Sequence, residues 1–433
     1  MNRPMRSLVA LAAMSLFSAQ APARDVVIHA GRLIDGVTAS PRTKVSILIK
    51  DDRVDSVQSG FMNPAGAEVI DLTGATVLPG LIDAHVHLTS APREGSPIAR
   101  KVTYSTADAV LTGLKNARTL LDKGFTSVRD VSGPTEAVVT LKHAIGEGEF
   151  PGPRMWVAGN ALGPTGGHSD ARNGLAPGID GHGWDDRVVD GADEATKAVR
   201  RLRREGVDLI KIMASGGVRS VGDNPDHTLM SEEEIGAIVK TAHALGMKVA
   251  AHATGKGAID LTTRLGVDSI EHGTLGDSQS HQLMKEHGTY LIPTMLVAHL
   301  GVKMAREHPE RLGPSSAAKA IRIGSQKIEN VRNAYRAGVK FAFGTDTQEG
   351  LNAEEFALLV GAGIPAEAAL LTATRNAADV LGASADVGTI QPGRYADIIA
   401  VMDDPLRDIS VLERVAFVMK GGEVVRALQA DGR

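Results

Sequence analysis

The 433-residue sequence contains no cysteine. Disulfide bonds are therefore excluded, and any metal ion must be bound through nitrogen and oxygen atoms. Aromatic residues make up only 3% of the chain, so the sequence offers no obvious aromatic-lined pocket. The formal net charge of −4 is also small, and it gives no electrostatic reason to expect nucleic acid or an anionic membrane surface as a partner.

The remaining composition is that of a globular protein. Hydrophobic residues account for 43% of the chain and charged residues for 23%, which allows a substantial core. A chain of this length is too long for one small domain. It fits a large domain accompanied by a smaller one.

The N-terminal residues have the pattern of an export signal. Arg3 and Arg6 precede an apolar stretch over residues 8–17. Residues 21–23 have the A-x-A form of a cleavage site. The apolar stretch is too short for a comfortable membrane span, so a retained anchor is the weaker alternative. We therefore expect residues 1–23 to be a signal peptide and the mature protein to be secreted, or periplasmic in a bacterium, without membrane contact after signal removal.

Short alternating strand patterns occur near both ends of the chain. They cover residues 26–28, 45–49, 54–57, 395–401, 415–419 and 423–425. Gly421 and Gly422 favour a tight hairpin turn before the last of them. Two terminal β segments around a long middle suggest one shared domain. We predict a composite β-sandwich built from residues 24–75 and 388–433.

The middle of the chain alternates between short apolar runs and segments of helical periodicity, such as residues 231–245 and 366–381. Eight apolar runs cover residues 76–86, 126–130, 155–159, 209–214, 248–253, 269–273, 290–294 and 341–346. Eight β/α alternations describe an α/β fold of the TIM (β/α)₈ barrel type, which we predict over residues 76–387. Such a barrel places its chemistry at the carboxyl ends of its strands.

Two histidines stand at the end of the first run. Residues two apart in a strand share one face, so His85 and His87 point in the same direction and can bind one ion. An H-x-H pair on its own is weak evidence, because packing and surface roles are common.

Lys211 lies inside the apolar fourth run. A buried ammonium is costly unless its charge is removed or paired. The lysine can therefore snorkel or form a buried ion pair. Alternatively, its amine has reacted with carbon dioxide, and the resulting carbamate is an anionic ligand able to bridge two metals. The lysine alone does not decide between these alternatives.

Three further runs also end in metal-binding residue types: His252 in the fifth, His272 in the sixth and Asp346 in the eighth. One such residue is usually structural, but six from five different strands predict a metal site. Imidazoles and carboxylates suit zinc, which we expect as the metal, with two divalent ions bound. Two neighbouring ions can share one hydroxide that attacks a carbonyl carbon while one ion polarises the carbonyl. Asp346 can bind metal, take the proton and deliver it to the leaving nitrogen.

With this set in place, the sequence resembles the amidohydrolase superfamily. The motifs that carry the resemblance are residues 78–87 (LPGLIDAHVH), Lys211, His252, residues 271–273 (EHG) and residues 344–346 (GTD). The resemblance implies that the two histidines of the first run and Asp346 hold the more buried metal. The histidines of the fifth and sixth runs would hold the more exposed one, and carboxylated Lys211 would bridge both.

Within that superfamily the sequence resembles the prolidase-like and imidazolonepropionase-like branch. The signs are residues 166–170 (GGHSD), 215–218 (SGGV) and 252–255 (HATG). The sequence is similar to the bacterial ochratoxin A-hydrolysing amidohydrolases, which release phenylalanine from an aromatic acyl group. The resemblance implies hydrolysis of a small-molecule substrate, a dipeptide or N-acyl amino acid with a free C-terminal carboxylate, as in a carboxypeptidase or dipeptidase. It also implies a homo-oligomer, an octamer being one form.

Residues 347–349 (TQE) depart from the small residue and glycine that branch members often carry after the last ligand. We therefore expect the rim near the eighth strand, and with it the substrate preference, to differ.

Other functions fit parts of the pattern. The same metal pair could hydrolyse a cyclic amide or a lactone. A non-catalytic periplasmic binding protein belongs to another class, but such a protein would tend to lose Asp346 or Lys211. A mononuclear deaminase is disfavoured, because residues 254–257 lack the catalytic glutamate that such enzymes carry after the fifth strand.

Loop residues beyond the strand ends are candidates for substrate contacts. His168, in a glycine-rich loop, could donate to the carbonyl oxygen as the oxyanion forms, with loop capping as the alternative. Arg219 could bind a substrate carboxylate through two hydrogen bonds, and a solvated loop arginine is an equal alternative. Asp130 is expected to be structural. No role is assigned to Tyr104, His182, His227 or His287.

Overall fold

The computed structural model describes residues 25–38, 40–90, 97–348 and 350–428. The predicted signal peptide, residues 1–23, lies outside this described part, and so does residue 349. Within the described residues, no helix has both the length and the apolar character needed to span a bilayer.

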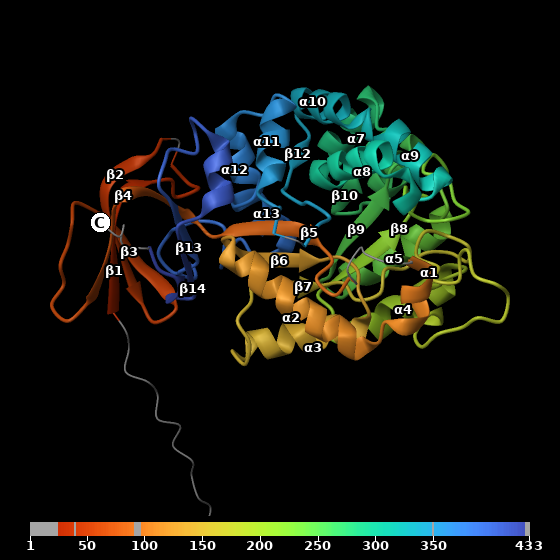
Figure 1. Cartoon of the computed structure of the whole chain (residues 1–433), viewed down its shortest axis with the longest axis horizontal. Coiled ribbons are helices and arrows are strands. Elements are labelled where there is room, and N and C mark those ends of the chain that lie inside the picture. The colour runs from red at the N-terminus through yellow and green to blue at the C-terminus, as the bar shows by residue number, and fades with distance from the viewer. Residues whose placement is uncertain (1–24, 39, 91–96, 349, 429–433) are drawn as a thin grey trace, which may run out of the picture.

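One seven-stranded sheet is built from both ends of the chain. From edge to edge it contains β15 (Glu423–Arg426), β14 (Phe417–Lys420), β13 (Ile398–Val401), β4 (Glu68–Pro79), β1 (Asp25–Leu33), β2 (Arg42–Lys50) and β3 (Arg53–Ser59). Strands β1 and β4 run parallel, and the other neighbours run antiparallel. Figure 1 shows this sheet at one end of the molecule, with red N-terminal strands beside blue C-terminal ones.

The hairpin turn predicted before the last strand is confirmed. Gly421 and Gly422 connect β14 to β15 with φ angles of 56° and 75°. Two consecutive positive φ angles suit the twist of a tight hairpin, and glycine adopts them without steric cost.

Apolar side chains from distant strands of this sheet share one buried cluster. Val26 and Ile47 lie in it together with Phe417 and Met419. The backbone also links the β3 edge to the segment before β13, because Val54 donates its N–H to the carbonyl of Arg394 at 2.9 Å. The two chain ends therefore bury a common core.

Eight further strands form two parallel sheets in the middle of the chain. One sheet contains β5 (Leu81–Val86), β6 (Phe125–Asp130) and β7 (Arg154–Val157). The other contains β8 (Leu209–Met213), β9 (Lys248–Ala253), β10 (Ser269–His272), β11 (Tyr290–Ile292) and β12 (Lys340–Phe341). Each apolar run predicted from the sequence overlaps one of these strands.

Hydrogen bonds also connect the two parallel sheets to each other. Asp208 donates its N–H to the carbonyl of Val157 at 2.8 Å, next to β7 and β8. On the opposite edges, Ala84 of β5 donates to the carbonyl of Phe343 at 2.9 Å, just after β12. The carboxyl ends of all eight strands are thereby brought to one side of the structure.

The run predicted as one strand over residues 76–86 contains two strands. Residues up to Pro79 complete β4, and β5 begins at Leu81. Gly80 separates them, and a Cβ at this position would lie 2.1 Å from Oγ1 of Thr126. Because the last residues of β4 and all of β5 are buried, the hydrophobic pattern alone gave no sign of the break.

Helices lie around the parallel strands (Figure 1). They are α1 (Pro97–Thr103), α2 (Thr106–Asp122), α3 (Thr135–Gly146), α4 (Ala192–Arg204), α5 (Glu232–Ala244), α6 (Lys256–Arg264), α7 (Ser278–His287), α8 (Met295–Glu307), α9 (Pro314–Gly324), α10 (Lys327–Ala337), α11 (Glu354–Gly361), α12 (Ala366–Thr372) and α13 (Arg375–Leu381). Helix α5 matches its predicted range, because Ser231 and Glu234 form a capping box at its start.

The helix predicted over residues 366–381 is instead two helices, α12 and α13. The carbonyl of Thr372 accepts the N–H of Phe343 at 2.9 Å, and the carbonyl of Ala373 accepts the N–H of Ile82 at 2.8 Å. These carbonyls bond to the strand region instead of continuing the helix. The helical period of the sequence did not reveal this tertiary contact.

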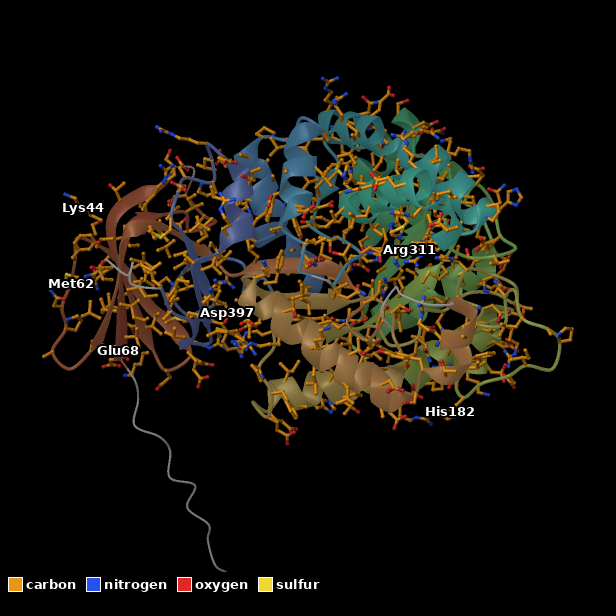
Figure 2. The ribbon with its side chains drawn as sticks, viewed as in Figure 1. Lys44, Met62, Glu68, His182, Arg311 and Asp397 are labelled. Atoms are coloured by element: carbon orange, nitrogen blue, oxygen red, sulfur yellow. The ribbon has the colours of Figure 1, made fainter. Side chains whose placement is uncertain are left out.

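Asp397, labelled in Figure 2, lies where the seven-stranded sheet meets the parallel strands. Its Oδ2 forms an ion pair of 3.0 Å with Nε of Arg154 in β7. Its Oδ1 accepts the N–H of Gly421 at 2.7 Å. The Arg154 guanidinium also lies 3.5 Å from the ring centroid of Tyr395. Polar contacts therefore hold the two parts of the molecule together.

Candidate metal centre

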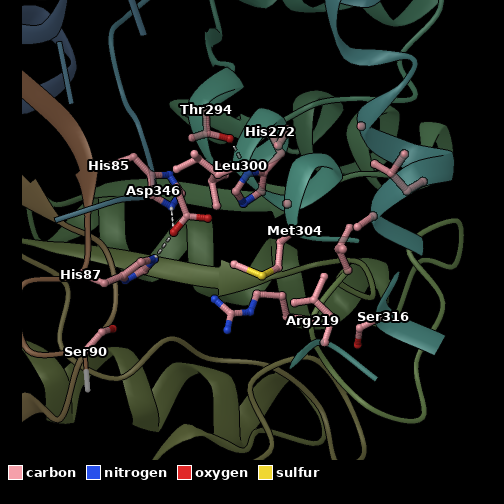
Figure 3. A pocket seen from close by; sticks show the side chains of 18 of the residues that line it. His85, His87, Ser90, Arg219, His272, Thr294, Leu300, Met304, Ser316 and Asp346 are labelled. Atoms are coloured by element: carbon pink, nitrogen blue, oxygen red, sulfur yellow. Dashed lines mark hydrogen bonds and ion pairs between the residues drawn. The ribbon is translucent and has the colours of Figure 1, made fainter. Parts of the chain in front are cut away.

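The six predicted ligands lie on or just after five different strands and line one cavity of about 920 Å³. They are His85 on β5, His87 just after it, Lys211 on β8, His252 on β9, His272 on β10 and Asp346 after β12. Figure 3 shows the side chains of His85, His87, His272 and Asp346 directed toward one another. The structure therefore brings together the whole set that the sequence singled out.

His85, His87 and Asp346 form the tightest part of the site. Oδ1 of Asp346 lies 3.1 Å from Nε2 of His87 and 3.9 Å from Nε2 of His85. One ligand atom from each residue lies within 4.8 Å of the other two, an arrangement that could hold a metal ion. Burial lowers the pKa of His87, but the hydrogen bond and charge of Asp346 outweigh it and raise this pKa above its usual value.

The second ring nitrogen of two histidines is held by the surrounding chain. Nδ1 of His87 donates to the carbonyl of Ser132 at 2.9 Å. Nδ1 of His272 lies 2.7 Å from Oγ1 of Thr294, which gives its own proton to the carbonyl of Pro293. Both histidines therefore carry their proton on Nδ1 and keep Nε2 as the ligand atom.

His85 is oriented by a buried carboxylate. Its Nδ1 lies 2.5 Å from Oε2 of Glu271. Oε1 of Glu271 accepts hydrogen bonds from Arg129 at 2.7 Å and Ser269 at 2.6 Å. Burial raises the pKa of Glu271, but the charges of Arg129 and Lys211 and the hydrogen bond from His85 lower it well below its usual value. Glu271 is therefore ionised and leaves Nε2 of His85 for a metal.

Sequence analysis missed Arg129 as part of this arrangement. The residue is 2% exposed and stands inside β6, a strand whose residues are all buried. A charged side chain inside an otherwise buried strand was the signal that drew attention to Lys211, and it applied to Arg129 equally.

Lys211 is 1% exposed, and its Nζ has no hydrogen-bond partner among the described residues. Burial lowers its pKa to about 8, with Glu271 opposing the shift and Arg129 assisting it. A neutral amine can react with carbon dioxide, and a carbamate would add oxygen ligands where Nζ has no partner. The environment of Lys211 therefore fits the bridging carbamate.

His252 lies beside this group. Its Nε2 is 3.2 Å from the carbonyl of Gly216, so a proton on Nε2 leaves Nδ1 as the ligand nitrogen. The ring centroid of His272 lies 4.7 Å from that of His252 and 5.1 Å from that of His85. A second pair of imidazoles thus adjoins the first metal-binding group.

Three residues of the cavity have a left-handed backbone: His272 with φ 71°, Thr294 with φ 49° and Asp346 with φ 55°. This conformation costs on the order of 1–3 kcal/mol for a residue other than glycine, and it persists where the surroundings enforce it. Two of the three are candidate ligands, and Oγ1 of Thr294 accepts the hydrogen bond from Nδ1 of His272. The strain therefore aims the side chains into the cavity.

Helices α8 and α9 form much of the remaining cavity wall. They contribute apolar side chains that include Leu300, Met304 and Ile323. Arg219, with an exposed side chain, lines the cavity with them (Figure 3). His168 also lines it, and its ring centroid lies 4.5 Å from that of His252. Both substrate-binding candidates therefore lie at the site.

Most of the remaining candidates lie away from the cavity. Tyr104 and His182 line a second cavity, of about 1260 Å³, which shares His168 and Arg219 with the first. His227 and His287 are not among the described residues that line either cavity.

Asp130 has the structural role expected for it. Its Oδ2 accepts the N–H of Leu88 at 2.7 Å. Burial raises the pKa of Asp130 to about 6, with the charge of His87 opposing the shift.

Helix α10 contributes Lys327, which sequence analysis missed. The residue is 3% exposed, and its Nζ donates to the carbonyl of His272 at 2.7 Å and to Oγ1 of Thr274 at 2.9 Å. Burial lowers its pKa to about 7, against the charges of Glu355 and Asp346. A lysine in an amphipathic helix carries no signal of this contact.

Comparisons with known proteins agree with this geometry. The model of the Amidohydrolase family matches residues 76–425. Ochratoxinase from Aspergillus niger is 31% identical over 429 residues, which cover 93% of this chain and 87% of that protein. The crystal structure of a Xaa-Pro dipeptidase with methionine bound in its active site has a TM-score of 0.87 and 35% identity, covering 93% of this chain and 100% of the other. A prolidase complexed with N-methylphosphonate-L-proline has a TM-score of 0.86 and 32% identity, with 93% and 100% covered.

Proposed function

This chain belongs to the amidohydrolase family and is a hydrolase acting on amide bonds, and on that premise we propose the reaction that it performs. We infer that it is a binuclear zinc enzyme that hydrolyses a dipeptide or an N-acyl amino acid with a free C-terminal carboxylate. The observation that carries this proposal is the buried Nζ of Lys211, which has no hydrogen-bond partner among the described residues, in a cavity that the other five predicted ligands also line.

In this proposal the eight parallel strands close into a barrel over residues 76–387. The hydrogen bonds from Asp208 to Val157 and from Ala84 to Phe343 support closure at both junctions of the two sheets. Residues 24–75 and 388–433 form the composite β-sandwich, which the buried cluster shared by both chain ends supports.

The five ligands other than Lys211 divide into two groups. His85, His87 and Asp346 would hold one ion, His252 and His272 would hold the other, and carboxylated Lys211 would be a ligand to both. Bound ions would supply an activated water and polarise the scissile carbonyl.

The side chains of the cavity would handle the protons. The carboxylate of Asp346 lies 3.1 Å from His87 and is 24% exposed, so it can take a proton and pass it to the leaving nitrogen. His168 presents a ring nitrogen to the oxygen of the substrate carbonyl as negative charge develops there. Asp346 and His168 are therefore the proposed catalytic residues.

The relatives guide the choice of substrate. We propose that Arg219, which lines the cavity, binds the substrate carboxylate, and that the apolar side chains of α8 and α9 accommodate an aromatic or aliphatic group. The similar proteins include a dipeptidase, a prolidase and an ochratoxinase. We take conversion of ochratoxin A to ochratoxin α and phenylalanine as the first reaction to test.

The test is a screen of N-acyl amino acids, dipeptides and ochratoxin A with the purified protein, before and after removal of metal by a chelator. We expect release of a free amino acid that stops on chelation and returns when zinc is added. Hydrolysis confined to lactones or cyclic amides, or release that persists without metal, would contradict the proposal.

We also propose that residues 1–23 direct export and that the mature protein is a homo-oligomer. The charged and apolar pattern of the N-terminus supports export. The family resemblance supports self-association, which light scattering on the purified protein would measure.

A further inference from the structure

The loop that follows β8, residues 214–228, holds the ring of His168 through a serine and a buried carboxylate. Nδ1 of His168 lies 2.8 Å from Oγ of Ser220. The same Oγ lies 2.5 and 2.6 Å from the two carboxylate oxygens of Asp223. The Asp223 side chain is only 2% exposed. A chain of hydrogen bonds therefore runs from a buried charge to a residue of the metal cavity.

The distances assign a direction to this chain. Ser220 has one hydroxyl proton, and its two short contacts place that proton toward Asp223 rather than the carbonyl of Gly217 at 3.3 Å. Oγ of Ser220 must then accept a hydrogen bond from His168, so Nδ1 carries a proton. The other nitrogen, Nε2, has no hydrogen-bond partner in the described part of the chain. It is the nitrogen left to meet a bound substrate in the cavity that His168 lines.

Two glycines allow the loop to approach the ring this closely. A Cβ at Gly217 would lie 2.1 Å from Cε1 of His168. A Cβ at Gly216 would lie 2.3 Å from the carbonyl oxygen of Asn224. Contact with His168 therefore accounts for Gly217, and close packing within the loop accounts for Gly216.

Helix α9 fixes the loop from the other direction. Nζ of Lys319 donates to the carbonyls of Gly217 at 2.8 Å and Ser220 at 2.7 Å, and it lies 3.5 Å from Oδ1 of Asp223. Lys319 is therefore the cation beside the buried carboxylate. It also links the loop to a helix that lines the metal cavity.

We propose that Asp223, acting through Ser220, is a positioning residue that fixes the tautomer and the ring orientation of His168. With the proton held on Nδ1, only Nε2 can exchange a proton with the substrate, and it donates a hydrogen bond to the carbonyl oxygen once it has itself taken up a proton. Lys319 keeps the carboxylate and the loop in place. The expected effect on catalysis rests on the proposed function, whereas the predicted tautomer of His168 does not depend on it.

The first experiment compares S220A and D223N with a matched control, D226N. Asp226 lies in the same loop and also pairs with α9, through a 2.9 Å contact with Arg322, but its side chain is 42% exposed. We expect kcat to fall about 10- to 100-fold in S220A and D223N, with KM changed by less than about twofold. D226N should match the unmodified protein. Equal losses in all three variants, or a change in KM alone, would contradict the proposal.

A double-variant cycle separates positioning from general stabilisation. If Asp223 acts through His168, adding D223N to H168A should lower kcat no further. If the two losses in log kcat simply add, Asp223 acts elsewhere and the inference is wrong. Zinc content and the thermal midpoint of each variant show whether metal or fold has been lost instead.

The tautomer can be read without any substrate. Ring ¹⁵N chemical shifts of histidine-labelled, zinc-loaded protein, with the His168 signals assigned by their loss in H168Q, should show a protonated Nδ1. S220A and D223N should lose this preference, and D226N should keep it. A proton on Nε2 alone in the unmodified protein, or no change in S220A and D223N, would overturn the inference. This readout decides the question even if no tested amide is hydrolysed.

Discussion

Two buried charged residues beside the cavity have very different surroundings. Glu271 accepts hydrogen bonds from His85, Arg129 and Ser269, whereas Nζ of Lys211 has no partner among the described residues. An unpaired ammonium in such a place is unfavourable. Conversion to a carbamate would remove that positive charge and supply an anionic ligand beside the neighbouring imidazoles. Substitution of Lys211 is therefore the most direct test of the proposed metal site.

We expect K211A to lose bound zinc and to lower kcat/KM by more than about 100-fold, because the bridging ligand is removed. Zinc content by elemental analysis and initial rates measure this. K211R should behave in the same way, since it retains a cation but cannot form a carbamate. Full zinc content in both variants would show that the lysine is not a ligand.

We expect E271Q to weaken zinc binding by about 10- to 100-fold, because the neutral amide holds the Nδ1 proton of His85 less firmly. Competition with a chromophoric chelator measures the affinity. E286Q is a suitable control, since Glu286 is exposed and its side chain accepts a hydrogen bond from Gln282 in the same helix. An unchanged affinity in E271Q would mean that Glu271 serves the fold and not the metal.

At this scale the sequence predicted the residues that stand at strand ends but not those that support them. His85, His252 and Asp346 were found because parallel strands finish at one edge. Lys327 reaches His272 from a helix, and Thr294 has a left-handed backbone. Neither the contact of Lys327 nor the backbone conformation of Thr294 produces a recognisable pattern in the local sequence.

Among the secondary-structure elements, α7 shows how a single side chain can set a boundary. Oδ1 of Asp277 accepts the N–H groups of Gln279 and Ser280 at 3.0 Å, and Lys256 lies 2.9 Å away. The hydrogen bond from Ser280 and the charge of Lys256 lower the pKa of Asp277 to about 2. The cap is therefore ionised over the whole neutral range.

We expect D277A to lower the free energy of unfolding by about 0.5–2 kcal/mol at pH 7, because α7 loses its cap. The pKa of Asp277 is lower in the folded chain than in the unfolded one, so its stabilisation is complete above about pH 4. It is lost as the pH falls toward about 2. Denaturant unfolding at several pH values should show the difference between the two proteins shrinking on acidification. D277N, which keeps a capping oxygen, should retain most of the stability at pH 7.

Element boundaries were predicted where local chemistry sets them and missed where tertiary contacts do. Ser231 and Glu234 indicate the start of α5 in the sequence, and they form a capping box there in the structure. The break between α12 and α13 arises because the carbonyls of Thr372 and Ala373 bond to Phe343 and Ile82, far away in sequence. The hydrophobic periodicity of the sequence contains no information about such a long-range hydrogen bond.

For the molecule as a whole, the alternation of apolar runs and helices indicated the parallel strands and their order. It did not indicate how the seven-stranded sheet attaches to them. That attachment depends on the ion pair of Arg154 with Asp397 and on the stacking of Arg154 over Tyr395. These residues are ordinary surface types in the sequence, and only the folded chain brings them together.

We expect D397A to lower the free energy of unfolding by about 1–3 kcal/mol, because it leaves Arg154 and the N–H of Gly421 without their acceptor. Zinc content should not change, since the junction contains no ligand. D386A is the matched control: Asp386 pairs with Arg53 but is 46% exposed, so its loss should cost less than about 1 kcal/mol. Equal effects of the two substitutions would show that the junction contributes no more than a surface pair.

The position of β13 beside β4 also affects the order in which the sheet can form during synthesis. Strand β4 pairs with β1 on one side and with β13 on the other, where Ile399 lies opposite Leu78. The residues of β13 are translated more than three hundred positions after those of β4. A nascent chain therefore cannot finish its first sheet until synthesis is almost complete. The C-terminal strands are therefore the step that commits the chain to its final fold.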